Sequence, residues 1–179
     1  MRSRTLSGLF MIEFVLHPNG NELRRGVYSA SEWFQFIQDT HSKGFCDTFS
    51  LTSADVFDDE YKQSVSPHHS VGPTLEFASV GQRTESDKWK NAGWLCTFIK
   101  SPDALFSFRG TDEKLEYSEY TIYTGVHMVE CNCICPRETL VPVLASFLTS
   151  PQIEPDENWL YFDDAFMTHS TYKARQNSG

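Results

Sequence analysis

The segment that decides the fold runs from Cys135 to Trp159 and reads CPRETLVPVLASFLTSPQIEPDENW. Its apolar residues recur at the spacing of one helical face, and they are Leu140, Leu144, Phe147 and Leu148. This spacing predicts an amphipathic helix over 137–149 that buries its apolar face in the core. Pro142 has no amide hydrogen to donate, so we expect it within the first turn or two of that helix. An acidic loop follows, and we expect Trp159 to order this loop against the core.

Upstream of this helix the chain is rich in β-branched and aromatic residues, which favour strands. Breakers separate five such segments, and we expect strands over Thr74–Val80, Gly93–Ile99, Ala104–Arg109, Glu119–Thr124 and Val126–Ile134. The short, regular separations indicate antiparallel neighbours. Met11–His17 alternates apolar and polar residues like a further strand, and 158–162 is expected to form a short edge strand.

A second helix is predicted before these strands. Ser29 and Glu32 have the spacing of a capping box, in which each side chain accepts a hydrogen bond from the other residue's backbone N–H. The helix is expected to end near Gly44, and 45–63 is expected to form a short strand with an acidic loop or short helix. Helix, strands and helix in this order predict an α+β fold: an antiparallel β-sheet of about five to six strands with helices packed on one face.

The 179 residues of the chain suit one domain, which we predict over residues 11–168. Residues 1–10 are expected to be disordered or to be a non-native start, because Met11 is an alternative first residue. Residues 169–179 are polar and are expected to form a flexible tail.

The net charge of −9 argues against binding to the phosphate backbone of nucleic acid, which requires many Lys and Arg. It suits a cationic partner, or simply a well-hydrated acidic surface. No apolar run approaches the ~20 residues that a membrane-spanning helix needs. Five cysteines, an odd number without a secretion signal, indicate reduced thiols, so we expect a cytoplasmic protein.

Three of these cysteines, Cys131, Cys133 and Cys135, alternate along a predicted strand, which would place their sulfurs on one face. Structural zinc sites space their ligands differently and need a second pair, which the sequence lacks. We therefore predict packed thiols and no metal or other cofactor. The adjacent His68 and His69 are interpreted as part of a solvated loop.

Few residues suggest catalysis. There is no Gly-x-Ser-x-Gly nucleophile elbow, and phosphate-cradling glycine loops are absent. A hydrolase that uses Cys46 with a histidine as its base is conceivable, and it stays as an alternative hypothesis. The sequence predicts that the protein is not an enzyme.

Acidic residues interleaved with aromatic ones form two clusters. Asp112, Glu113, Glu116, Tyr117 and Glu119 lie in and after one loop, with Lys114 as the only base. The second cluster flanks Trp159 and Tyr161 and contains Glu154, Asp156, Glu157, Asp163 and Asp164. Such surfaces suit a basic protein partner, because charge steers the encounter and rings anchor it. The alternative is a solvated rim around a core Trp.

The second half of the chain resembles immunity protein family one of bacterial polymorphic toxin systems. The resemblance rests on a strand, a helix opened by Val-Pro, an aromatic residue near the end of this helix, and a loop that contains Pro and precedes a Trp. The residues of this chain that carry these features are Ile134, Val141-Pro142, Ala145, Phe147, Pro155 and Trp159. Leu105–Phe108 is similar to the family's apolar strand. The resemblance implies a small cytoplasmic inhibitor made beside a toxin, as in contact-dependent inhibition, and the family's toxins include nucleases and nucleic-acid deaminases.

The hypothesis that follows is a non-catalytic immunity protein that covers the basic active site of one cognate toxin. The residues expected to bind this partner are Asp112, Glu113, Glu116, Tyr117, Glu119, Asp156 and Glu157. Two alternatives stay open: the hydrolase already named and an adaptor that binds another protein.

Overall fold

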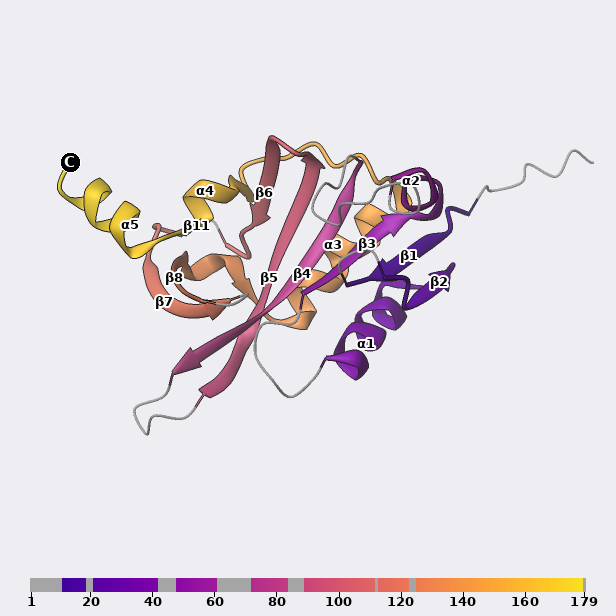
Figure 1. The fold of residues 1–179 in the computed structure, drawn as a ribbon, viewed down its shortest axis with the longest axis horizontal. Coiled ribbons are helices and arrows are strands. Elements are labelled where there is room, and N and C mark those ends of the chain that lie inside the picture. The colour runs from indigo at the N-terminus through magenta and orange to yellow at the C-terminus, as the bar shows by residue number, and fades with distance from the viewer. Residues whose placement is uncertain are drawn as a thin grey trace, which may run out of the picture.

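The computed structural model describes residues 11–18, 21–41, 48–60, 72–83, 89–111, 113–122 and 125–178. In these residues eleven strands form one antiparallel sheet, accompanied by five α-helices (Figure 1). The prediction of an α+β fold with a large antiparallel sheet is confirmed. The predicted number of about five to six strands is wrong. Several of the additional strands have only two or three residues, which is too short to show an alternating pattern in the sequence.

Seven strands follow one another across the sheet. In spatial order they are β10 (Trp159–Tyr161), β6 (Ala104–Phe108), β5 (Trp89–Ser101), β4 (Thr74–Arg83), β3 (Thr48–Ser53), β1 (Phe14–His17) and β2 (Arg24–Gly26). The remaining strands are β7 (Tyr117–Ile122), β8 (Gly125–Glu130), β9 (Ile134–Cys135) and β11 (Phe166–Met167). The register of β4 on β5 shifts between Val80 and Gly81, and beyond this irregularity Gly81 pairs with Thr121 of β7. Since such irregularities bend a strand, the far end of β4 is free to join the β7–β8 hairpin.

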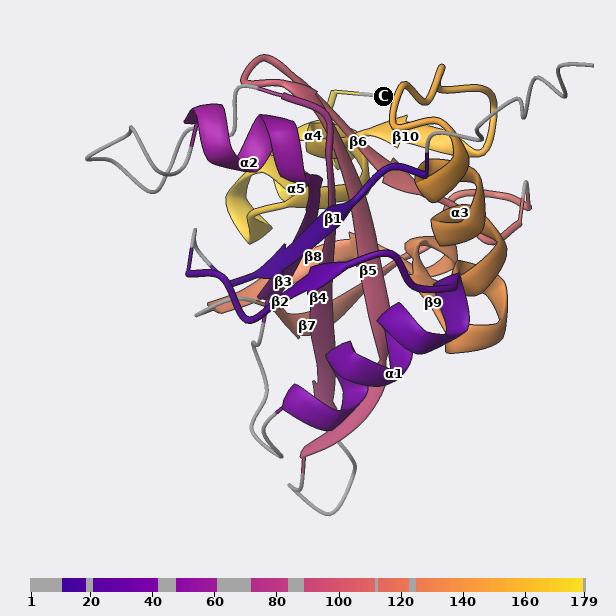
Figure 2. The ribbon, with the colours of Figure 1, turned by 90° about the vertical axis from the view of Figure 1, so that its right-hand side faces the viewer.

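Helices α1 (Ala30–Thr40) and α3 (Arg137–Thr149) lie together on one side of the sheet (Figure 2). The predicted capping box of α1 is confirmed: the backbone N–H of Ser29 donates to Glu32 at 2.8 Å, and that of Glu32 donates to the Ser29 hydroxyl at 3.3 Å. α1 ends at Thr40, before the predicted end near Gly44. α3 has the predicted bounds, and Pro142 lies in its second turn.

The larger hydrophobic core fills the space between these two helices and the sheet. Its fully buried large side chains include Trp33, Phe34, Phe77, Phe98 and Phe147. The Phe34 ring lies edge-on to Phe77, with centroids 5.5 Å apart. Trp159 packs on this core through ring contacts with Phe98 and Phe108, while its role in ordering the preceding loop stays a prediction.

A second core occupies the other face of β4 and β5. Alternate residues of a strand point to opposite faces, so Leu75 and Phe77 of β4 face the first core while Ala78 and Val80 face the second. The β7–β8 hairpin and α4 (Phe162–Ala165) cover this second face. Both faces of the central strands are therefore buried.

The prediction that the helices pack on one face is wrong. Phe14 and Leu16 of β1 face α1 and α3, whereas Val15 between them packs against Ala54 and Phe57 of α2 (Ala54–Glu60). α2 and α4 thus lie on the face opposite α1 and α3. The alternation of apolar and polar residues predicted over Met11–His17 is therefore wrong for β1, where all four residues are buried because both faces are covered.

Two further segments differ from the predictions. The strand predicted over 126–134 ends at Glu130, and Cys131–Cys133 form a 3-10 turn, so the three sulfurs do not alternate along one strand. The segment predicted as a flexible tail contains α5 (His169–Gln176), which the Thr168 hydroxyl caps by accepting from the Thr171 N–H. Among the described residues no helix is both long and apolar enough to cross a membrane.

A chain of buried polar groups links β1, β3 and β4. The His17 ring contacts the Thr52 hydroxyl at 3.0 Å, and Thr52 contacts Thr74 at 3.0 Å. The Thr74 hydroxyl donates to the carbonyl of Gly72. His17 is 1% exposed, and burial lowers its pKa to about 4. The imidazole is therefore neutral in the folded protein at neutral pH.

This burial predicts acid destabilisation. An unfolded histidine takes up a proton near pH 6.5 while folded His17 resists it down to about 4, so stability is lost as the pH falls between these values. We expect the His17 contribution to lower the free energy of unfolding by about 2 kcal/mol between pH 7.5 and pH 5. Urea unfolding of the wild type and of His17→Gln, which keeps a hydrogen-bonding side chain but does not titrate, measures it. An equal loss in both proteins would contradict the assignment to His17.

Candidate partner-binding surface

The β6–β10 pair brings the two acidic segments together. Trp159 pairs with Phe108, so the residues before Trp159 and those after Phe108 leave the sheet at the same end. The N–H of Arg109 donates to the carbonyl of Asn158 at 2.7 Å and extends this pairing by one step. Glu113 therefore lies on a loop next to the loop that carries Asp156 and Glu157.

Arg109 is hydrogen-bonded through its side chain to the backbone of the first of these loops. Its side chain is 9% exposed, and its guanidinium donates to the carbonyls of Thr111 at 3.0 Å and Glu113 at 2.7 Å. Hydrogen bonds from a charged donor are stronger than neutral ones, and these two bonds fix the backbone of the loop. The Glu113 carboxylate is left exposed at its top.

Glu130 holds the other end of the same loop. This residue is fully buried at the end of β8, and one of its carboxylate oxygens accepts from the Glu116 N–H at 3.3 Å and from the Asn132 amide at 3.0 Å. The Cys131 N–H donates to the carbonyl of Glu116 at 2.7 Å. The loop between β6 and β7 is thus tied to buried charged groups at both ends.

The second loop is ordered locally. The Asp156 carboxylate accepts from the N–H of Asn158 at 2.9 Å, and the Asp156 carbonyl accepts from the N–H of Trp159 at 3.0 Å. This turn leads directly to Trp159, whose partly buried ring packs on the main core. One Asp156 oxygen therefore serves the turn, while the Glu157 side chain next to it is exposed.

The remaining predicted residues lie beside α5. The Tyr117 hydroxyl donates to the carbonyl of Asp164 at 2.8 Å, and its ring lies 5.5 Å from Tyr172. Burial raises the pKa of Tyr117, and the nearby carboxylate of Asp164 adds to this. Glu119 is exposed and lies 3.4 Å from the ring nitrogen of His169.

The structure thus divides the predicted partner-binding residues into two neighbouring groups. The first, at the end of the β6–β10 pair, contains Glu113, Asp156 and Glu157; the second, at the start of β7, contains Glu116, Tyr117 and Glu119. Asp112 lies outside the described residues. Sequence reasoning missed Arg109, although it is a charged residue at the end of the strand predicted over Ala104–Arg109. It also missed Glu130, a charged residue in the middle of the strand predicted over Val126–Ile134, which in the structure is the last residue of β8.

Three of the described thiols, those of Cys96, Cys133 and Cys135, are poorly suited to nucleophilic catalysis. Burial raises the pKa of Cys96 and Cys133 well above the ordinary value, and it raises that of Cys135 to about 11. A nucleophilic cysteine needs a lowered pKa, because the thiolate is the reactive form. Cys46, the nucleophile of the alternative hypothesis, and the pair His68 and His69 lie outside the described residues.

Within the described ranges, no group of three or more His, Cys, Asp or Glu side chains is arranged to hold a metal ion. Comparisons of this chain with protein-family models, with curated proteins and with solved structures gave no match.

The anchoring role of Arg109 is testable by Arg109→Met, which keeps most of the aliphatic stem and removes both donors to the loop. We expect the free energy of unfolding to fall by about 2 to 3 kcal/mol, because charged hydrogen bonds are lost and two carbonyls lose their donor. Hydrogen exchange at the amides of Glu113 and Glu116 should become faster. The control is Arg137→Met, whose guanidinium bonds Gln35 and Gln38 at the exposed surface and whose loss should cost under about 1 kcal/mol. Equal effects of both changes would refute the role of Arg109.

Proposed function

We propose that this chain is a non-catalytic immunity protein that neutralises a cognate bacterial toxin. In this proposal the toxin is a basic nuclease or deaminase acting on nucleic acid, and the acidic surface covers its active site. The protein acts in the cytoplasm of the producing cell and uses no cofactor. The resemblance of the second half of the chain to immunity protein family one supplies the class of partner.

The observation that carries the proposal is the anchored acidic loop between β6 and β7. The buried side chains of Arg109 and Glu130 are hydrogen-bonded to its backbone, and the Glu113 and Glu116 side chains are exposed to solvent. A loop that is already ordered loses less conformational entropy on binding than a flexible one. A buried ionisable side chain at each end is an uncommon cost for a surface loop, and it favours a role that needs this loop in one shape.

Electrostatics supports the choice of a basic partner. Glu113, Asp156 and Glu157 lie on the two loops at one end of the β6–β10 pair, whereas Glu116 directly precedes β7 and Glu119 lies on it. An active site that binds a polyanion carries Lys and Arg, and a matching acidic patch steers association and rejects acidic proteins. The half-buried Tyr117 adds an aromatic group of the kind that anchors interfaces.

A first test uses the gene next to the one that encodes this chain. We expect the adjacent gene to encode a toxin, and we expect cells that express this toxin to survive only when the chain is produced with it. A neighbouring toxin against which the chain gives no protection would refute the proposal, and a neighbour that is part of a structural operon would favour the adaptor alternative.

A second test addresses the surface. Glu113→Lys with Glu116→Lys should slow association with the inactivated toxin by about tenfold at low salt, because charge steering acts mainly on the association rate. The control, Asp39→Lys with Asp103→Lys, makes the same change in net charge at exposed positions on α1 and at the opposite end of β6. Both proteins should unfold at the wild-type urea concentration. Equal association rates for the two variants would mean that the site is elsewhere.

A further inference from the structure

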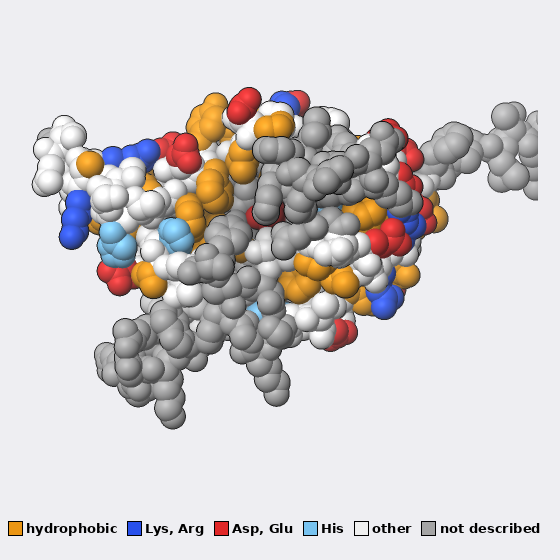
Figure 3. Space-filling model, viewed as in Figure 1, with side chains coloured by type: hydrophobic (Ala, Val, Ile, Leu, Met, Phe, Trp, Pro, Cys, Tyr) orange, Lys and Arg blue, Asp and Glu red, His pale blue; other side chains and the backbone are white. Residues whose placement is uncertain are grey.

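Helix α5 lies directly over the second group of acidic residues, and its own sequence is basic. It reads HSTYKARQ and carries Lys173 and Arg175 in its last turn without any Asp or Glu. At this end of the molecule basic, histidine and acidic side chains lie side by side on the surface (Figure 3). The chain thus places one of its own basic segments on its acidic surface.

The contacts that hold α5 are few and exposed. His169 lies 3.4 Å from Glu119, Arg175 lies 2.8 Å from Asp164, and Tyr172 contacts the ring of Tyr117. The four side chains of the two ion pairs are each 41–64% exposed, and pairs of this kind contribute little stability. No residue of α5 is buried. Since a helix of eight residues is unstable by itself, α5 depends on these weak contacts.

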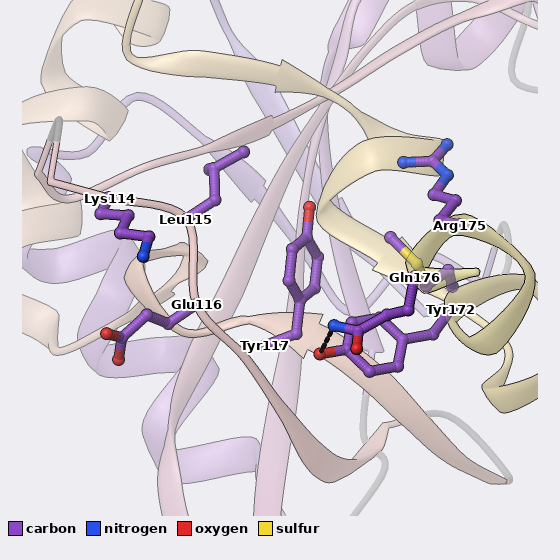
Figure 4. Close-up of a pocket in the computed structure, with 8 residues that line it drawn as sticks. Lys114, Leu115, Glu116, Tyr117, Tyr172, Arg175 and Gln176 are labelled. Carbon is purple, nitrogen blue, oxygen red and sulfur yellow. Dashed lines mark hydrogen bonds between the residues drawn. The ribbon is translucent and has the colours of Figure 1, made fainter. Parts of the chain in front are cut away.

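Unfilled space borders α5 on two sides. A cavity of about 580 Å³ is lined on one side by Lys114–Tyr117 and on the other by Tyr172, Arg175 and Gln176 of α5. In Figure 4 Tyr117 lies between Glu116 and these α5 residues. A second cavity of about 440 Å³ lies against α4 and β11 and is lined by Phe162 and Phe166. Both cavities reach Met167 and Arg175. α5 therefore occupies only part of a larger groove.

The chain is firmly fixed just before α5. Met167 of β11 is buried, and β11 pairs with Val129 and Met128 of β8. Thr168 follows as the capping residue. A change of backbone angles at this position would move α5 off the surface without disturbing the sheet.

We infer that the groove under α5 is a binding site for a basic helix of the partner, and that α5 is an internal substitute which the partner displaces. The acidic groups Glu119 and Asp164 receive the cations of the incoming helix, and Tyr117 receives an aromatic or aliphatic side chain next to them. The cavities supply room for a helix with larger side chains than those of α5. This inference rests on the proposed function in one respect, namely that the basic helix belongs to the toxin.

The test uses the full chain and a synthetic peptide with the sequence of Thr168–Ser178 as the probe. In the variant His169→Ser, Tyr172→Ser, Arg175→Ser the internal helix is weakened, and we expect this variant to bind the peptide about tenfold more tightly than the wild type does, because less of the site is occupied internally. Amide signals of Tyr117, Glu119 and Asp164 should shift on binding. In the wild type, saturating peptide should speed hydrogen exchange in α5.

Two controls define the outcome. A peptide with Ser in place of its His, Lys and Arg should not bind. The further changes Glu119→Lys and Asp164→Lys in the weakened variant should abolish binding of the basic peptide.

Equal affinity of the wild type and the weakened variant for the peptide, or peptide binding without shifts at the amides of Tyr117, Glu119 and Asp164, would overturn the inference. Toxin neutralisation with α5 still protected from exchange would refute this inference alone. Displacement of α5 by the peptide without toxin neutralisation would refute only the proposed function.

Discussion

The long antiparallel pairing of β4 with β5 is the interaction on which the rest of the structure depends. It runs from Thr74 opposite Ile99 to Arg83 opposite Trp89, and both of its faces are covered. One face meets α1 and α3 across an aromatic core, and the other meets the β7–β8 hairpin and α4. Because alternate residues serve two separate cores, a shift of this pairing by one residue would turn the side chains of each core toward the other core and disrupt the packing of both.

The candidate site follows from this arrangement. β6 pairs with β5, and β10 pairs with β6. Because Trp159 at the start of β10 lies opposite Phe108 at the end of β6, the loops that adjoin these two residues are neighbours. The hairpin on the second face brings Glu130 under the far end of the first loop. Burial of Arg109 and Glu130 is costly, and the loop backbone offsets part of that cost by providing carbonyls to the guanidinium and an N–H to one oxygen of Glu130, whose other oxygen is buried without a hydrogen bond. The strand pairing that forms the core therefore also positions the loops of the acidic surface.

Sequence reasoning was most successful where the pattern is local. The capping box at Ser29 and Glu32, the bounds of α3 and the packing of Trp159 depend on near neighbours or on one strongly apolar face. It was least successful for short strands and for surfaces. The three residues of β2 have no periodicity of their own, and the polar sequence of α5 has no buried face from which a helix could be predicted.

The sequence by itself determined the α+β class, the two helices that cover the main core and the presence of two acidic segments, because composition and short-range periodicity specify these features. Only the tertiary structure decided that these segments are neighbours, that buried charges at Arg109 and Glu130 hold one of them, and that α5 covers part of the acidic surface. The physical reason is that strand pairing joins residues far apart in the chain, and no local pattern records which strands will meet.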